Sequence, residues 1–477
     1  MSDFTMTIGG DAAPEAGSFG VINPASGAVF AEAPECTAAQ LDAAFDAAAK
    51  AQRDWKADED FRRETLRKMA DVMLAAGEIL NPILTAEQGK SLEGASIETF
   101  GSAMWLQYYA GLEQPREIIQ DDDSSFVEVL RRPLGVVAGI TPWNFPLLLA
   151  FWKIAPALLA GNTMVLKPSP FTPLTTLKMG ELLREVMPPG VLNVISGGDG
   201  LGAMMTTHPT PRKVSFTGSI ETGKKVALSA AADLKRVTLE LGGNDPAIVL
   251  DDADPSIVGD AIFEGAFANC GQICSAIKRV YVPESIFDEV VEVLVEKART
   301  IRVGEGTEPG VELGPINNLP QFERVKELVS DAISTGAAAP AGGAAMDRPG
   351  YFFQPTILTG LLDGTRIVDE EQFGPALPVI SYRDLDDAVE RANASNFGLS
   401  GSVWGGDEER AHEVATRLEC GTAWVNTHLA LGPHQPFGGF KWSGLGVENG
   451  PWGLAEFSEI QAVHRSKVAG SPSISAG

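Results

Sequence analysis

Segments typical of strands and of helices alternate regularly through the middle of this chain, and this alternation constrains the fold more than any other feature. Buried strands are predicted at 133–140, 163–169, 191–196, 213–219 and 236–243, with helical periodicity between them. Parallel strands need long crossover connections, which are usually helices. The pattern therefore predicts a doubly wound parallel sheet, with ligand sites at the carboxyl ends of its strands.

A second alternation covers 245–419 and predicts another α/β domain of similar plan. It includes a strand at 245–250, a helix over 255–276 that carries Cys274, and a strand at 278–283. With 477 residues the chain exceeds the size that one hydrophobic core usually serves, so two or three domains are expected.

The ends of the alternation predict a small β arm. An exposed strand is expected at 124–132, and the C-terminal segment 453–465 ends in a strand pattern that can pair with it near Phe126. Such an arm needs a partner edge, which predicts a homodimer or homotetramer. Residues 1–115 and 134–240 are expected to form a cofactor-binding domain, and residues 241–442 a catalytic domain. Residues 116–133 and 443–477 are expected to form the oligomerisation arm and the tail.

Composition excludes several classes of function. A formal net charge of −26 argues against binding nucleic acid or an anionic membrane. The N-terminus lacks the pattern of a signal peptide, and no stretch reaches the roughly 18 apolar residues of a membrane span. The 4 cysteines, without paired or metal-ligand spacing, favour a reducing, cytoplasmic compartment and predict no metal site.

Cys274, in the stretch GAFANCGQICSAIKR, is the candidate nucleophile. A thiolate attacks carbonyl carbons well, provided that neighbouring groups favour its ionisation and donors hold the developing oxyanion. The alternative is that Cys274 is a small buried apolar residue, which is the commoner role of a cysteine.

Two further polar residues follow predicted strands. Asn144 lies in the rigid loop TPWNFP and can supply an amide to an oxyanion hole, although Asn and Pro are also common in turns. Glu240 ends an apolar strand before two glycines, where burial would raise its pKa toward that of a general base. Its alternative is a carboxylate paired with a lysine or capping a helix.

The stretch FTGSIETG at 216–223 is the better of two candidate phosphate cradles. Gly218 and Ser219 end a strand, and the following residues open a helix whose amides can face a pyrophosphate. A plain turn from strand to helix is the alternative. A weaker match to the glycine fingerprint uses Gly198, Gly200 and Ala203.

Taken in order, these motifs resemble those of the aldehyde dehydrogenase superfamily, the NAD(P)-dependent enzymes that use a thiol. The motifs are PWNFP at 142–146, KPSPFTP at 167–173, FTGS at 216–219, ELGGN at 240–244, GQIC at 271–274, EEQFGP at 370–375 and PFGGFKWSG at 436–444. The resemblance covers essentially the whole chain. It implies a Rossmann-like cofactor domain, a catalytic domain and an oligomerisation arm.

The resemblance implies that Cys274 adds to an aldehyde, that Asn144 holds the oxyanion, and that Glu240 activates the water that hydrolyses the thioester. Hydride leaves to NAD or NADP, and the product is a carboxylic acid. Glu240 argues against the branch of the family that acylates coenzyme A.

The resemblance also implies the residues that contact the cofactor. Lys167 would hold the adenine ribose, Glu371 the nicotinamide ribose, and Phe373 would pack near the nicotinamide. The full set is Thr141, Trp143, Lys167, Ser169, Pro170, Gly218, Ser219, Gly223, Leu241, Glu371 and Phe373. Many NAD-preferring members have a glutamate where this chain has Pro170, so NAD is only slightly favoured over NADP.

The predicted substrate tunnel is mostly apolar. Its residues are Phe145, Trp152, Ile273, Ser275, Leu431 and Phe437. An aromatic or aliphatic aldehyde is therefore expected first. The alternatives are a semialdehyde or aminoaldehyde dehydrogenase and, from another class, a non-catalytic oligomeric scaffold of the same fold, which would have no need of the three catalytic groups together.

Overall fold

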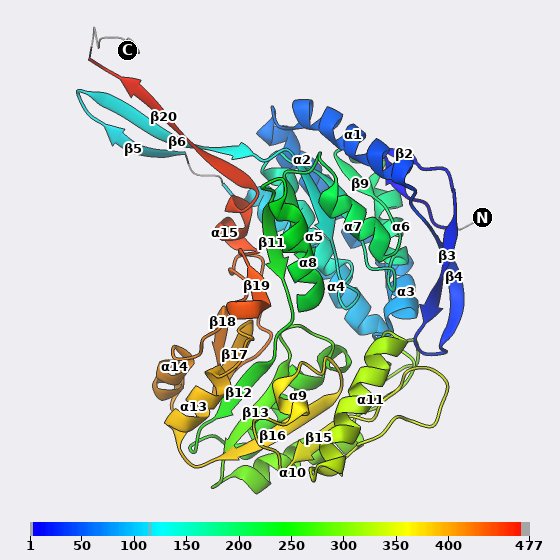
Figure 1. Cartoon of the computed structure of the whole chain (residues 1–477), viewed down its shortest axis with the longest axis vertical. Helices are drawn as coiled ribbons and strands as arrows, with labels where there is room; N and C mark the ends of the chain where they lie inside the picture. The colour runs from blue at the N-terminus through cyan, green and yellow to red at the C-terminus, as the bar shows by residue number, and fades with distance from the viewer. Residues whose placement is uncertain (1–2, 114–115, 469–477) are drawn as a thin grey trace.

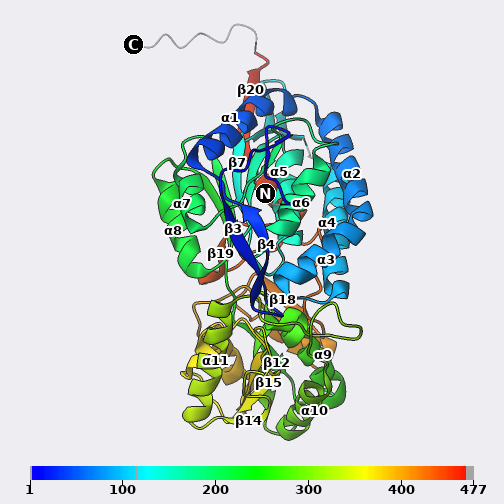
Figure 2. The same ribbon diagram turned by 90° about the vertical axis from the view of Figure 1, so that its right-hand side faces the viewer.

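The computed structural model describes residues 3–113 and 116–468 and shows two lobes with a projecting arm (Figure 1; Figure 2). Each lobe is built on a mostly parallel sheet covered by helices, as the alternation of the sequence predicts. Residues 1–2, 114–115 and 469–477 lie outside this description, including the end of the predicted tail.

The first lobe contains an eight-stranded sheet in the order β19-β11-β10-β7-β8-β9-β1-β2. The strands from β11 to β9 are parallel, and antiparallel strands flank them at both edges. All residues of β7, β8 and β10 are buried, because helices cover both faces. The strands span Thr7–Ile8 (β1), Asp11–Ala12 (β2), Val136–Ile140 (β7), Thr163–Lys167 (β8), Leu192–Val194 (β9), Lys213–Thr217 (β10), Arg236–Glu240 (β11) and Gly444–Leu445 (β19).

Helices α1, α5, α6, α7 and α8 of the first lobe pack on this sheet, and α2, α3 and α4 pack mainly on other helices. Thr37 begins the first of them with a capping box to Gln40, which satisfies backbone groups at the helix start. The helices span Ala38–Trp55 (α1), Glu59–Ala75 (α2), Gly77–Gln88 (α3), Leu92–Gly111 (α4), Leu148–Leu159 (α5), Leu174–Leu183 (α6), Asp199–Thr207 (α7), Ile220–Ala231 (α8) and Gly450–Ala455 (α15). Among the described residues, no single helix is long and apolar enough to cross a membrane, and α2 and α3 meet that test only as a pair bent by 71°.

The second lobe contains a seven-stranded sheet in the order β14-β15-β16-β13-β12-β17-β18, parallel except at β14. Its strands span Asp245–Val249 (β12), Ile277–Pro283 (β13), Ala338–Ala341 (β14), Thr356–Thr359 (β15), Ala376–Tyr382 (β16), Ser400–Trp404 (β17) and Thr422–Val425 (β18). Its helices span Pro255–Phe267 (α9), Phe287–Thr300 (α10), Leu319–Ser334 (α11), Arg366–Asp369 (α12), Leu385–Asn393 (α13) and Glu408–Ala415 (α14), with short 3₁₀ turns at Ala268–Gly271 (η1) and Lys441–Ser443 (η2).

The helix predicted over 255–276 is wrong in its second half. Helix α9 ends at Phe267, and Asn269, Cys270 and Gly271 follow with φ values of 50°, 59° and 70°. Consecutive residues in the left-handed region cannot continue a right-handed helix. Cys274 therefore lies in a turn immediately before β13 rather than on a helix.

The arm consists of three antiparallel strands in the order β20-β6-β5, spanning Ser458–Ser466, Ser125–Pro133 and Glu117–Asp121. The predicted pairing near Phe126 is confirmed, since Arg465 of β20 lies opposite it in the ladder. In Figure 1 the arm projects from the first lobe. Near the N-terminus, a separate hairpin joins Ser18–Asn23 (β3) and Ala28–Pro34 (β4).

Candidate active site

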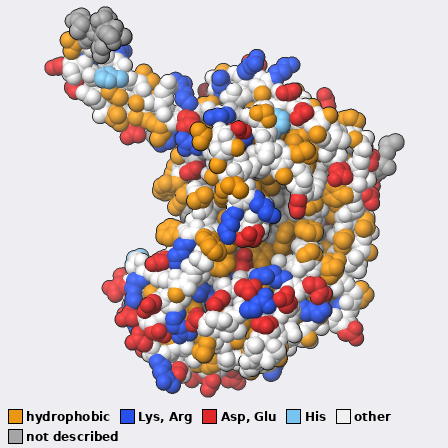
Figure 3. All heavy atoms as spheres, in the orientation of Figure 1, with side chains coloured by type: hydrophobic (Ala, Val, Ile, Leu, Met, Phe, Trp, Pro, Cys, Tyr) orange, Lys and Arg blue, Asp and Glu red, His pale blue; other side chains and the backbone are white. Residues whose placement is uncertain are grey.

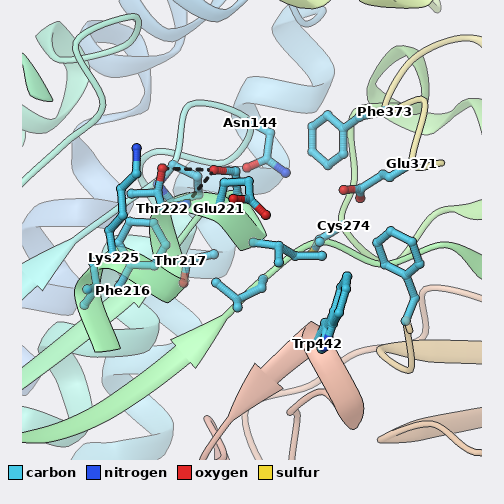
Figure 4. A pocket seen from close by; sticks show the side chains of 18 of the residues that line it. Asn144, Phe216, Thr217, Glu221, Thr222, Lys225, Cys274, Glu371, Phe373 and Trp442 are labelled. Carbon is cyan, nitrogen blue, oxygen red and sulfur yellow. Dashed lines mark hydrogen bonds between the residues drawn. The ribbon is translucent and has the colours of Figure 1, made fainter. Parts of the chain in front are cut away.

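A large cleft of about 1720 Å³ lies between the two lobes. The space-filling view shows it as a hollow, and the close-up shows residues of α8 at one end and Cys274, Glu371 and Phe373 at the other (Figure 3; Figure 4). Its lining includes most predicted cofactor positions, namely Thr141, Trp143, Lys167, Ser169, Pro170, Gly218, Ser219, Leu241, Glu371 and Phe373. Gly223 does not line the cleft. A Cβ added there would press on Leu241, so this glycine lets α8 approach that lining residue.

Cys274 lines the cleft in the turn before β13, and its carbonyl oxygen accepts a hydrogen bond of 2.6 Å from the ammonium of Lys278. Burial raises the pKa of the Cys274 thiol to about 12. The positive charge of Lys278 acts in the opposite direction, and the carboxylates of Asp245, Glu240 and Glu371 raise the pKa further. The thiol is therefore protonated at neutral pH in this state, so nucleophilic attack requires a proton acceptor.

Asn144 is buried, and its side-chain amide points to the turn that carries the cysteine. Its Nδ2 donates to the carbonyl oxygen of Gln272 at 3.0 Å. A primary amide has two hydrogens, so one hydrogen remains to stabilise an oxyanion near Cys274.

Gly242 and Gly243 of the ELGGN motif have to be glycines, because neighbouring atoms approach their Cα atoms too closely to leave room for a Cβ. A Cβ on Gly242 would clash with the carboxylate of Glu371, and a Cβ on Gly243 would lie 2.6 Å from the carbonyl oxygen of Cys274. The amide N–H of Gly243 donates to Glu371 Oε1 at 3.1 Å. The ELGGN motif thus brings its carboxylate, the cysteine turn and the Glu371 loop together.

Glu240 is the last residue of β11 and is buried, and neither of its carboxylate oxygens has a hydrogen-bond partner among the described residues. Burial raises its pKa well above the usual range. The charge of Glu448 raises this pKa further, and that of Lys153 lowers it. Lys153 and Glu448 form a buried ion pair of 2.6 Å. A buried carboxyl group whose pKa is raised in this way, next to the lining of a cleft, is a candidate for proton transfer.

The residues at the far end of the cleft fit a dinucleotide. Ser219 caps α8 and accepts from the amide of Thr222 at 3.3 Å, which places a helix N-terminus at the cleft. Lys167 ends β8, and burial lowers the pKa of its ammonium to about 8. Two glycines of the alternative fingerprint lie at the start of α7. Gly198 is the N-cap residue of this helix, and Gly200 lines the cleft.

The model of the aldehyde dehydrogenase family matches residues 12–463. The chain belongs to this family. Retinaldehyde dehydrogenase 3 from Homo sapiens is 39% identical over 455 residues, which cover 93% of this chain and 89% of that protein. Betaine aldehyde dehydrogenase from Staphylococcus aureus, solved in complex with NAD+, has a TM-score of 0.95 at 34% identity and covers 99% of this chain and 96% of its own. An NADP dependent enzyme from E. coli has a TM-score of 0.95 at 36% identity, with 98% of each chain covered.

The protein is accordingly an NAD(P)-dependent aldehyde dehydrogenase. Two aromatic residues of the lining, Trp143 and Phe373, meet edge to face with ring centroids 5.2 Å apart. Phe373 has a φ of 48°, which turns the loop after α12 so that both Phe373 and Glu371 line the cleft.

Four of the six predicted substrate residues belong to the apolar core of the first lobe or pack against it, and none of the six lines the cleft. Trp152 stacks on Trp105 at 5.4 Å and meets Phe437 edge to face at 5.3 Å. Phe145 and Leu431 pack against the same core.

The two residues flanking Cys274 lie in the same turn. The carbonyl of Ile273 accepts from Lys278 at 2.9 Å, and the carbonyl of Ser275 is 2.7 Å from Nε2 of His428. Burial lowers the pKa of His428 to about 3, so this imidazole is neutral.

Sequence reasoning missed the buried charges that surround the site. Lys278, Lys153 and the pair formed by Lys90 and Glu98 are all buried. One of these residues could have been found from the sequence, because Lys153 is a single lysine in a helix that is otherwise apolar. Trp105 of α4 is also buried, and it stacks on Trp152.

Proposed function

We propose that this aldehyde dehydrogenase oxidises apolar aldehydes to carboxylic acids through a thioester on Cys274. The observation that carries the proposal is the convergence of three groups, because Asn144 points to the cysteine turn and the charge of Glu240 acts on the Cys274 thiol. An oligomeric scaffold has no need for this arrangement.

In the first half of the reaction, the sulfur of Cys274 attacks the aldehyde carbon. The thiol proton passes to solvent water in the cleft on attack, since burial keeps the thiol protonated in the free enzyme. The carbonyl oxygen becomes an oxyanion, and the free amide hydrogen of Asn144 stabilises it together with the backbone amide of Cys274. When bound, the nicotinamide dinucleotide accepts the hydride that the thiohemiacetal carbon loses, which leaves a thioester on Cys274.

In the second half, the carboxylate of Glu240 takes a proton from water as the water oxygen attacks the thioester carbon. The carbon–sulfur bond then breaks, the acid leaves, and the proton that Glu240 took from water returns to the sulfur of Cys274. The two oxygens of Glu240, which have no hydrogen-bond partner among the described residues, suit this role, because a general base needs a free lone pair to accept the proton.

We infer that Lys167 and Glu371 hold the two riboses, that Ser219 and Trp143 contact the pyrophosphate region, and that Phe373 packs near the nicotinamide. The size of the cleft and the helix N-terminus at Ser219 support this assignment. NAD remains slightly favoured over NADP, although Pro170 in the lining has no charge to repel a 2′-phosphate.

We expect an aromatic or aliphatic aldehyde, because the core against which Cys274 packs is apolar and includes Trp152 and Phe437. One relative is named for retinaldehyde, a large apolar aldehyde, and one structural neighbour for betaine aldehyde, which is cationic. Apolar aldehydes should therefore react faster than semialdehydes or aminoaldehydes.

The division into domains, the assembly and the compartment are also proposals. We assign 1–115 with 134–240 to cofactor binding, 241–442 to catalysis, and 116–133 with 443–477 to the arm and tail. The exposed arm supports assembly into a homodimer or homotetramer, and four free cysteines suit a reducing cytoplasm.

The test is the absorbance at 340 nm with benzaldehydes, alkanals, succinate semialdehyde and betaine aldehyde, each with NAD and NADP. We expect turnover with the apolar aldehydes, its loss in Cys274→Ala, and its retention in the matched variant Cys420→Ala. Turnover that survives in Cys274→Ala would overturn the proposed mechanism. Activity confined to charged aldehydes would overturn the proposed substrate class.

A further inference from the structure

Lys278 is a buried cation at the centre of the site. It is the second residue of β13, inside the sheet of the second lobe, and its side chain is only 2% exposed. Removing an ammonium group from water is costly unless partners replace the water. Its partners therefore indicate why the chain keeps a lysine inside a fully buried strand, whose other charged residue is Arg279.

The three hydrogens of this ammonium match three acceptors. It donates to the carbonyl oxygens of Ile273 at 2.9 Å and Cys274 at 2.6 Å, and Glu371 Oε1 lies 3.4 Å away. The first two acceptors belong to the turn that presents the nucleophile. The third belongs to the loop that we propose to bind the nicotinamide ribose.

The Glu371 loop is anchored on both sides of this contact. The side-chain amide of Gln372 donates to the backbone carbonyl of Lys278 at 3.1 Å, and the guanidinium of Arg324 donates to the carbonyl of Glu371 at 3.1 Å. The lysine therefore connects two elements that are each held in place. Figure 4 shows Cys274 and Glu371 at the same end of the cleft.

The charges around the thiol make this lysine significant. Carboxylates face Cys274 from three elements, with Asp245 on β12, Glu240 on β11 and Glu371 on the loop after α12, and each raises the pKa of the thiol. Lys278 on β13 acts in the opposite direction. His428, which contacts the same turn through Ser275, is neutral because burial lowers its pKa to about 3.

We propose that Lys278 is a positioning residue that fixes the Ile273–Cys274 turn, supplies the positive charge that favours the thiolate, and couples both to the position of the Glu371 carboxylate. This inference rests on the proposed role of Cys274. It predicts opposite effects for removal of the two charges: loss of the cation disfavours the thiolate, and loss of the Glu371 anion favours it.

The experiment measures the rate at which iodoacetamide alkylates Cys274, read by mass spectrometry of the peptide at several pH values without aldehyde or cofactor. In Lys278→Met we expect alkylation at pH 8 to be about tenfold slower, which corresponds to a rise of about one unit in the thiol pKa. Lys278→Arg keeps the charge and should remain within about threefold of the parent rate, and Glu371→Gln should be about threefold faster.

Lys213→Met is the matched control, since Lys213 is also fully buried but lies at the amino end of β10, the opposite end of that strand from the cleft. It should leave the alkylation rate of Cys274 unchanged. The proposal is overturned if Lys278→Met is alkylated at the parent rate with an unchanged melting temperature, or if Glu371→Gln is slower. If Lys278→Met fails to fold, the arginine and glutamine variants decide. Turnover retained in Cys274→Ala would instead refute the proposed function, which this assay does not measure.

Discussion

The ammonium of Lys90 lies 2.6 Å from Oε2 of Glu98, and it also donates to the backbone carbonyl of Asn144 at 3.0 Å. The other carboxylate oxygen of Glu98 accepts from the amides of Leu147 and Leu148 at the start of α5. Both charged side chains are almost fully buried. One ion pair therefore fixes the loop that carries the proposed oxyanion donor.

Lys90→Met should lower both stability and turnover. Leaving Glu98 buried without its partner costs about 3–5 kcal/mol, and a small displacement of Asn144 should reduce kcat by about tenfold to a hundredfold. Calorimetry and steady-state kinetics measure the two effects. Lys68→Met is the control, because it removes an ion pair with Glu64 that is exposed to solvent and screened by it. Equal effects of the two variants would contradict the account.

The free enzyme should show a steep pH dependence of thiol reactivity. Burial raises the pKa of Cys274 to about 12, so the thiolate is a minor species at every pH below that value. Its fraction, and hence the alkylation rate, should rise about tenfold for each pH unit between about pH 7 and 9. A plateau in this window would mean that the thiol is already ionised in the absence of cofactor.

Pro170→Glu should shift cofactor preference toward NAD. A carboxylate at this position of the cleft lining would repel a 2′-phosphate, and we expect kcat/KM with NADP to fall about tenfold to a hundredfold while that with NAD changes little. Pro170→Ala controls for loss of the proline ring. A parallel loss with both cofactors would show that Pro170 does not face the adenine ribose.

The arm should carry an interface between copies of the chain. Ile118 on β5 and Ile460 on β20 are 53% and 64% exposed, which is unusual for large apolar side chains on sheet strands. Replacing both by glutamate should reduce the mass measured by light scattering. The same change at Ile257, which is 68% exposed on α9 away from the arm, should leave the mass unchanged. An unaltered mass in the arm variant would rule out this interface.

Most of the strands and helices followed from local periodicity, whereas the expected cofactor residues followed from the resemblance of the motifs. Several of these motifs lie at the carboxyl ends of β7, β8, β10 and β11. The end of α9 did not follow from periodicity, because Asn269 and Cys270 take left-handed conformations that neither residue type requires. The buried lysines were missed for a related reason. Whether Lys278 or Lys90 finds a carboxylate depends on residues distant in sequence, and periodicity carries no information about such partners.

The most direct test of the central claim is the transient kinetics of Glu240→Gln with NAD and benzaldehyde. The account predicts a burst of reduced cofactor of about one equivalent per site, slow turnover afterwards, and one acyl group on Cys274 in the intact mass, because the thioester forms but water is not activated. Steady-state turnover at the parent rate, or a protein that carries no acyl group after the burst, would contradict it.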